Sequence, residues 1–142
     1  MSIQRFEDLN AWQNARVLVN FVYDLRKDQK TRDFNLVNQI QRAAVSVMAN
    51  ISEGFGRFSF KDSKQFYTIA RGSIAEVQSH LYILLDRKMV SKEEFVKVYE
   101  QSVITNKLIN GLIRNANCRL TQEYGNSQTR ELTNPRTREL NL

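Results

Sequence analysis

Apolar residues recur at helical spacing in four blocks of this chain, and this periodicity limits the possible fold more than any other feature. The first block is a stripe of residues that step by three or four positions, namely Ala11, Ala15, Leu18, Val22 and Leu25. A second block runs from about Phe34 to Glu53. A third begins after Ser59, where Asp62 completes a weak capping pair, and it ends near Asp86. Each block predicts an amphipathic α-helix.

The fourth block has the clearest start signal in the sequence. Ser91 and Glu94 form the S-x-x-E pattern of a capping box, and Val90 and Phe95 occupy the two positions of a hydrophobic staple. Apolar residues at helical spacing then continue to Ala116. We therefore expect a fourth long helix from Ser91 onward.

Turn-forming residues are scarce, because the 142 residues include only 5 glycines and 1 proline. A β-sandwich or barrel of this length needs many more turns. Long helices with short connections lie antiparallel to their neighbours. Residues 1–120 are therefore expected to form one all-α domain, an up-down-up-down antiparallel four-helix bundle.

Beyond Leu120 the sequence changes character. Residues 121–142 contain few apolar side chains and the only proline, and the word TREL occurs at 129–132 and again at 137–140. Polar, repetitive sequence of this kind is typical of disorder. The charged side chains of the segment balance one another: Arg130, Arg136, Arg138, Glu123, Glu131 and Glu139. We expect a disordered polar tail without net charge.

The positive charge of the chain therefore belongs to the bundle. The formal net charge is +6 and the sequence pI is about 9.7. A basic balance favours nucleic acid or another anionic surface as a partner. Cys118 is the only cysteine, which excludes an intrachain disulfide and fits a reducing compartment. Without a signal-peptide core or an apolar run near the ~18 residues of a membrane helix, we expect a cytoplasmic protein and no membrane association.

The stretch QRAAVSVMANISEGFGR, residues 41–57, interrupts an apolar helix with polar side chains. Helical spacing places these on one face, opposite a polar face of the third helix. Together they form a predicted polar seam of Arg42, Ser46, Asn50, Gly72, Ser73 and Glu76. Here we expect Arg42 to pair with Glu76, and Asn50 to bond a backbone group or Ser73. Gly72 is expected to permit close approach of the two helices, because glycine inside a helix costs about 0.5–1 kcal/mol relative to alanine.

Two glycines follow this helix. Gly54 is expected to end it in a positive-φ conformation, and Gly56 to let the chain turn toward Ser59. A phosphate-binding glycine loop is the alternative, but GFGR lacks the spacing of such loops and joins two helices instead of leaving a strand.

The sequence offers little for catalysis. His80 is the only histidine, and Ser79 beside it points about 100° away on a helix. One histidine and one cysteine on different helices do not supply the usual metal-ligand sets. Glu53 and Glu76 are the alternative carboxylate pair, although ion pairing or capping is their expected role. We predict a protein that is not an enzyme, with no metal and no cofactor.

A cluster of cations is the candidate nucleic-acid site. One end of the predicted bundle gathers Arg57, Lys61, Lys64 and Arg114, and Arg71 lies along one outer face with Lys61 and Lys64. Phe55, Phe58 and Phe60 crowd the adjoining turn and either stack on bases or plug the bundle end or a subunit interface. An ordinary solvated surface is the alternative interpretation of the cations.

Several segments of the sequence resemble those of a known family, over roughly residues 6 to 116. FEDLNAWQNA, QRAAVSVMANISEGFGR and KQFYTIARGSIAEVQSHL resemble the four-helix-bundle proteins encoded in intervening sequences of bacterial 23S rRNA genes. The resemblance implies a homopentamer without established enzymatic activity. A related branch, the accessory proteins of diversity-generating retroelements, binds nucleic acid and a reverse transcriptase through a basic surface. This chain departs from the pattern at Gln41, where a second arginine is common, and at LDRKMV, which lacks a glycine.

Two functions remain open on these grounds. The first is a homopentameric bundle that binds RNA or DNA weakly and with little sequence specificity. The second is a pure protein–protein assembly or scaffold. The expected partners are further copies of the chain, nucleic acid, and a protein such as a reverse transcriptase.

Overall fold

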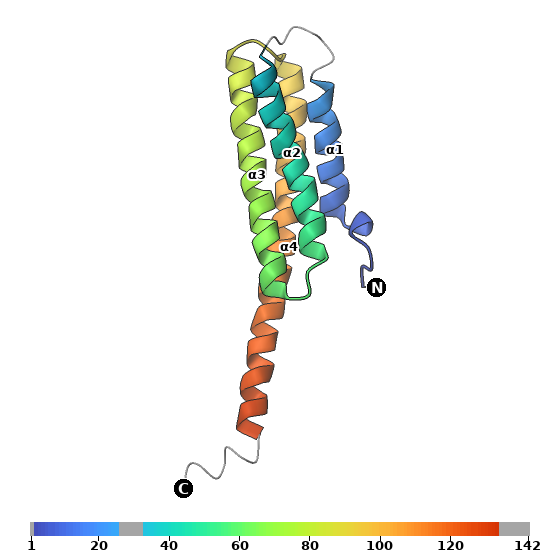
Figure 1. Cartoon of the computed structure of the whole chain (residues 1–142), viewed down its shortest axis with the longest axis vertical. Coiled ribbons are helices and arrows are strands. Elements are labelled where there is room, and N and C mark those ends of the chain that lie inside the picture. The colour runs from blue at the N-terminus through green and yellow to red at the C-terminus, as the bar shows by residue number, and fades with distance from the viewer. Residues whose placement is uncertain (1, 26–32, 134–142) are drawn as a thin grey trace.

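The computed structural model describes residues 2–25 and 33–133, with side chains to residue 129. Its elements are a short 3-10 helix, η1 (Phe6–Asp8), and four α-helices (Figure 1): α1 (Asn10–Asp24), α2 (Phe34–Phe55), α3 (Phe60–Asp86) and α4 (Lys92–Thr133). The described ranges contain no β-strand. The predicted all-α, four-helix fold is therefore confirmed.

The helices surround one core. α1 packs against α2 and α4, and α3 packs against the same two helices. Figure 1 shows each helix running opposite to the one before it. The predicted stripe of α1 is buried throughout, and the largest fully buried side chains elsewhere include Ile40, Ile51, Ile74, Leu81, Leu84 and Ile109.

Local capping interactions begin two of the helices as predicted. The Ser59 hydroxyl accepts a hydrogen bond from the Asp62 N–H at 3.1 Å. Before α4, the Glu94 N–H donates to the Ser91 hydroxyl at 3.1 Å, and the Ser91 N–H donates to the Glu94 carboxylate at 3.0 Å. This reciprocal pair satisfies two backbone donors that a helix start leaves unbonded.

The turn between α3 and α4 contains a strained residue. Lys88 has φ of 56°, the one positive φ of a non-glycine residue in the described part of the chain. The Met89 N–H donates to the Leu84 carbonyl at 2.8 Å and the Lys88 N–H donates to the Leu85 carbonyl at 3.0 Å. These two bonds define a Schellman motif, whose left-handed position usually carries glycine. Lys88 occupies the position where the sequence lacks that glycine.

Lys88→Gly is therefore expected to stabilise the protein. The left-handed conformation costs a residue with a side chain about 1–2 kcal/mol, and the greater freedom of unfolded glycine offsets part of the gain. We expect the free energy of unfolding to rise by about 0.5–1 kcal/mol. Urea denaturation monitored by circular dichroism measures the change, and a lower midpoint for the glycine variant would contradict the strain argument.

The predicted tail differs from the structure at its start. α4 has 42 residues and continues without interruption past Leu120 to Thr133. Residues 121–129 are all exposed, and Figure 1 shows this part of α4 projecting beyond the bundle. Extending an existing helix avoids the cost of nucleation, so a polar segment can continue a helix that the bundle has already formed. Residues 134–142 of the predicted tail lie outside the described residues.

The prediction that Gly54 ends α2 in a positive-φ conformation is wrong, whereas Gly56 lies where the chain turns after α2. Gly54 lies inside α2, is buried and does not have positive φ. Gly56 is the C-cap residue, with φ of −78° and ψ of −3°, which any residue adopts. A Cβ atom on Gly54 would lie 2.7 Å from Cε1 of Tyr67 and 3.1 Å from Cβ of Phe66. Gly54 is therefore required by the close approach of α3, not by a turn.

Candidate nucleic-acid interface

Four of the five predicted cations lie on two neighbouring helices, and Lys61 and Lys64 lie at the end of the bundle where α3 begins. Lys61, Lys64 and Arg71 belong to α3, and Arg114 belongs to α4. Nη1 of Arg71 donates a hydrogen bond to Oδ1 of Asn110 on α4 at 3.3 Å. This bond joins the two helices at this surface. Lys64 lies seven residues before Arg71, or two helical turns, on the same side of α3. We call Lys61, Lys64, Arg71 and Arg114 the α3–α4 basic face.

Arg57 differs from these four residues. It forms an ion pair with Glu53 one turn earlier, and its guanidinium lies 4.4 Å from the ring centroid of Phe66. The two ionised side chains are 41% and 53% exposed, so solvent weakens their attraction. Glu53 nevertheless offsets much of the charge that Arg57 presents to a partner.

Lys107 is an exposed cation that the sequence interpretation missed. It lies seven residues before Arg114 and three before Asn110, which places it beside the α3–α4 basic face. The spacing of Lys107 and Arg114 was the signal that could have identified it.

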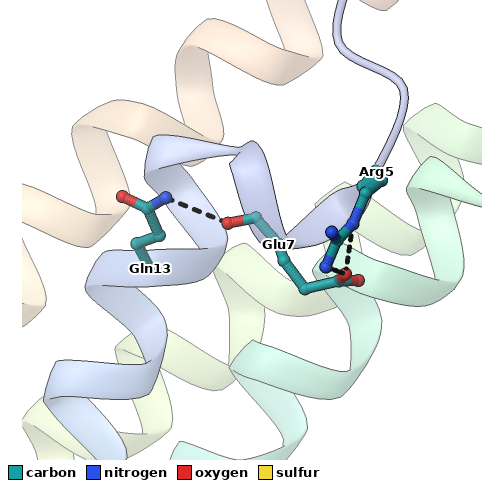
Figure 2. A network of polar contacts seen from close by, with 3 residues as sticks. All are labelled: Arg5, Glu7 and Gln13. Atoms are coloured by element: carbon teal, nitrogen blue, oxygen red, sulfur yellow. Dashed lines mark hydrogen bonds and ion pairs between the residues drawn. The ribbon is translucent and has the colours of Figure 1, made fainter.

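A hydrogen-bonded network fixes the N-terminal segment at the same end (Figure 2). Nε of Arg5 donates to Oε2 of Glu7 at 2.7 Å, and Nε2 of Gln13 on α1 donates to the Glu7 carbonyl at 2.9 Å. The hydrogen bond from Arg5 to Glu7 raises the pKa of the arginine. The Glu7 carboxylate therefore pairs with Arg5, and the Glu7 backbone is bonded to α1. Because Arg5 is paired, it adds little free positive charge to this end of the bundle.

The central residues of the predicted polar seam, Ser46, Asn50 and Ser73, form hydrogen bonds in the structure. The hydroxyl oxygens of Ser46 on α2 and Ser73 on α3 lie 2.9 Å apart. Nδ2 of Asn50 donates to the Ser46 carbonyl at 2.8 Å and to the Ser46 hydroxyl at 3.0 Å. Asn50 thus bonds a backbone group, one of the two partners predicted for it, and the seam holds α2 against α3 through Ser46.

The predictions for Arg42, Glu76 and Gly72, at the edges of the seam, are wrong. Arg42 and Glu76 are both exposed and form no ion pair with each other; Glu76 instead lies 3.5 Å from Nε2 of His80, one turn along α3. Gly72 is exposed, and a Cβ added there would meet nothing within 4 Å. Adjacent residues on a helix point about 100° apart, so Ser73 faces α2 while Gly72 faces solvent.

The aromatic cluster at the bundle end divides into buried and exposed rings. Tyr67 is 6% exposed and Phe55 packs against the core, whereas Phe60 is 37% exposed and Phe58 is fully exposed. Tyr67 lies under Gly54 inside the subunit. Phe58 and Phe60 remain available to a partner.

His80 makes no hydrogen bond to a hydroxyl in the described part of the chain. Its side chain is 15% exposed, and neither ring nitrogen has a hydrogen-bond partner in the described structure. Within residues 2–25 and 33–133, no three His, Cys, Asp or Glu side chains gather as metal ligands would. None of the described helices combines the length and apolar character needed to cross a membrane.

Comparisons with known proteins agree with this architecture. Residues 7–111 match the family described as 23S rRNA-intervening sequence protein. A crystal structure of a protein of unknown function from the S23 ribosomal protein family of Bacteroides thetaiotaomicron is similar, with a TM-score of 0.62 and 27% identity, over 72% of this chain and 94% of that one. No curated protein matches the sequence. Since the matched region spans most of the chain, with the whole of α1, α2 and α3 and the first part of α4, the protein belongs to the 23S rRNA-intervening sequence protein family.

Proposed function

We propose that the protein is a non-enzymatic homo-oligomer that binds RNA or DNA weakly, with little sequence specificity, through the α3–α4 basic face. The observation that carries the proposal is the distribution of charge on two adjacent helices. α3 has no carboxylate from Ser63 to Ala75, and α4 has none from Gln101 to Gln122. The charged side chains in these two segments are cations only: Lys64, Arg71, Lys107, Arg114 and Arg119.

Phosphate neutralisation is the expected source of affinity. Lys61, Arg71 and Arg114 are exposed, and lysine and arginine in such a position release counterions from a nucleic-acid backbone. Sequence is read by side chains that reach base edges in a groove, and the sequence contains no motif for such recognition. Weak sequence specificity follows from contacts that are mainly to phosphate.

Assembly is the second part of the proposal. Apolar side chains on three helices are 42–47% exposed: Val45, Ile69, Ile83, Val96 and Ile104. On the outer side of α2, the Gln41 amide nitrogen is buried without a hydrogen-bond partner, close to Val45. A buried donor without a partner is costly, and an acceptor from another subunit would satisfy it. Five subunits is the number implied by the family resemblance, and a ring would multiply weak phosphate contacts.

The same exposed apolar residues favour the second candidate, a scaffold that assembles without nucleic acid. The two functions share an oligomer and differ in salt-sensitive binding. A salt titration therefore distinguishes them, provided that the oligomer is measured on the same samples.

The test is fluorescence anisotropy of labelled RNA and DNA duplexes with the full chain, between about 50 and 300 mM salt, with light scattering of the protein. We expect a mass several times that of one chain and an affinity that falls steeply with salt, by about 0.9 logarithmic units per tenfold salt for each phosphate contacted on duplex DNA. Oligomers that bind neither nucleic acid at 50 mM salt would support the scaffold. A monomer mass at micromolar concentration would contradict the assembly.

A further inference from the structure

A cavity of about 440 Å³ opens at the end of the bundle that carries the N-terminal segment. Its lining comes from the N-terminal segment, the last residue of α2, the α2–α3 connection, α3 and α4. Its apolar walls include Leu9, Phe55, Phe60 and Leu112. Cavities of this volume accept small organic molecules, and their few polar groups determine which molecule fits.

The polar side chains of this end cavity are cationic or neutral. Arg57 and Arg119 line it, together with Tyr67 and Asn115, and no carboxylate does. Arg57 uses one Nη2 in its ion pair with Glu53, which leaves further N–H donors for a ligand. The Tyr67 hydroxyl is a neutral hydrogen-bonding group at physiological pH, and burial raises its pKa further above the usual value.

The groove around Phe21 lacks this asymmetry. Between α1 and α4, the surface around Phe21 carries Lys92 and Lys97 against Glu93 and Glu100. Balanced charge of this kind selects no anion. The end cavity combines aromatic walls with two arginines and no lining carboxylate, although Glu53 pairs with Arg57 from outside the lining.

We propose that the end cavity holds one unpaired nucleotide of a single-stranded nucleic acid, with the base against Phe55 and Phe60 and a phosphate on Arg57 and Arg119. This inference rests on the proposed nucleic-acid binding and adds a base-dependent site to it. A planar ring joined to an anion matches the two kinds of surface that the cavity presents. A duplex cannot enter, because its bases are stacked and paired.

The test compares two labelled strands of equal length and charge, twelve thymidine nucleotides and an abasic strand, binding to the full chain at about 50 mM salt. We expect the thymidine strand to bind at least about fivefold more tightly, because one base stacked on an aromatic ring contributes roughly that much or more. Phe60→Ala is expected to bring the two affinities together. Phe58→Ala is the matched control, since it removes a fully exposed ring from the same turn that does not line the cavity.

Circular dichroism checks that each variant folds. Tyr67→Phe provides a second arm, because it keeps the ring and removes only the hydroxyl; we expect it to weaken binding of the thymidine strand and leave the abasic strand unchanged. Equal affinities of both strands for the unaltered protein would overturn the cavity site and leave phosphate binding intact. If Phe58→Ala reduced the affinity for the thymidine strand as much as Phe60→Ala, the base would lie on the outer turn, and the cavity site would also be overturned. Failure of both strands to bind would contradict the proposed function itself.

Discussion

Gly54→Ala is expected to lower the free energy of unfolding by about 1–3 kcal/mol, although alanine is the better helix former. The added Cβ would lie 2.7 Å from Cε1 and 2.9 Å from Cδ1 of Tyr67, and 3.1 Å from Cβ of Phe66. The Tyr67 ring is 6% exposed and is packed in the core cluster, so displacing it would disrupt core contacts. The expected response is separation of the C-terminal end of α2 from the first turns of α3.

Gly72→Ala provides the matched control within the same pair of helices. Gly72 is exposed, and its added Cβ would meet nothing within 4 Å. The same substitution should therefore raise the free energy of unfolding by about 0.5–1 kcal/mol, because alanine restricts the unfolded chain and favours the helix. Chemical denaturation of both variants measures the difference in sign. If Gly72→Ala lowered the free energy of unfolding and Gly54→Ala left it unchanged, the close helix contact would lie at Gly72. That result would contradict the packing described for Gly54.

These two glycines illustrate what helical periodicity predicts and what it does not. The stripe through Ser73 was placed correctly against α2, as the contact between Ser73 and Ser46 demonstrates. The glycine one residue earlier was assigned to the same face, although the 100° rotation per residue carries it outward. Gly54 was interpreted as a helix end because glycine is common there. Only the distance to Tyr67, a residue of the next helix, reveals its role.

Local signals predicted the helix starts well, because capping depends on neighbours in sequence. Ser91 and Glu94 satisfy each other's backbone donors within one turn, and no distant residue is needed. The Arg42–Glu76 pair failed for the opposite reason: it needed the relative rotation and axial register of α2 and α3. The end of α4 was also hard to predict, since polar composition after Leu120 argues against packing but does not prevent a helix from continuing.

The candidate nucleic-acid site falls between these cases. Spacing along α3 identified Lys64 and Arg71, but the contact between Arg71 and Asn110 is what joins them to α4. The ion pair of Arg57 with Glu53 follows an i, i+4 spacing visible in the sequence. The end cavity was not predictable, because its walls come from segments that meet only in the folded bundle.

Replacing both Lys61 and Lys64 by glutamate is expected to weaken binding of duplex DNA and RNA roughly 100-fold at about 50 mM salt. The slope of log affinity against log salt should fall by the amount that about two phosphate contacts contribute. Both residues lie in the first two turns of α3, where a carboxylate interacts favourably with the helix dipole, so the fold should be retained. The loss should be similar for unrelated sequences, because phosphate contacts carry no sequence information. Salt titrations of the unaltered and substituted proteins measure both the affinity and the slope.

Arg87→Glu with Lys92→Glu is the matched control, since it makes the same change in charge at the far end of the bundle. Arg87 follows the last residue of α3 and Lys92 begins α4, and both side chains are exposed. Long-range repulsion alone would weaken binding in the two double variants equally, whereas contact through the α3–α4 basic face predicts a much larger loss for Lys61 and Lys64. Light scattering should give the same oligomer mass for all three proteins. Equal affinities of the two variants would place the nucleic acid elsewhere, and undiminished binding by the Lys61 and Lys64 variant would remove the basic face from the proposed function.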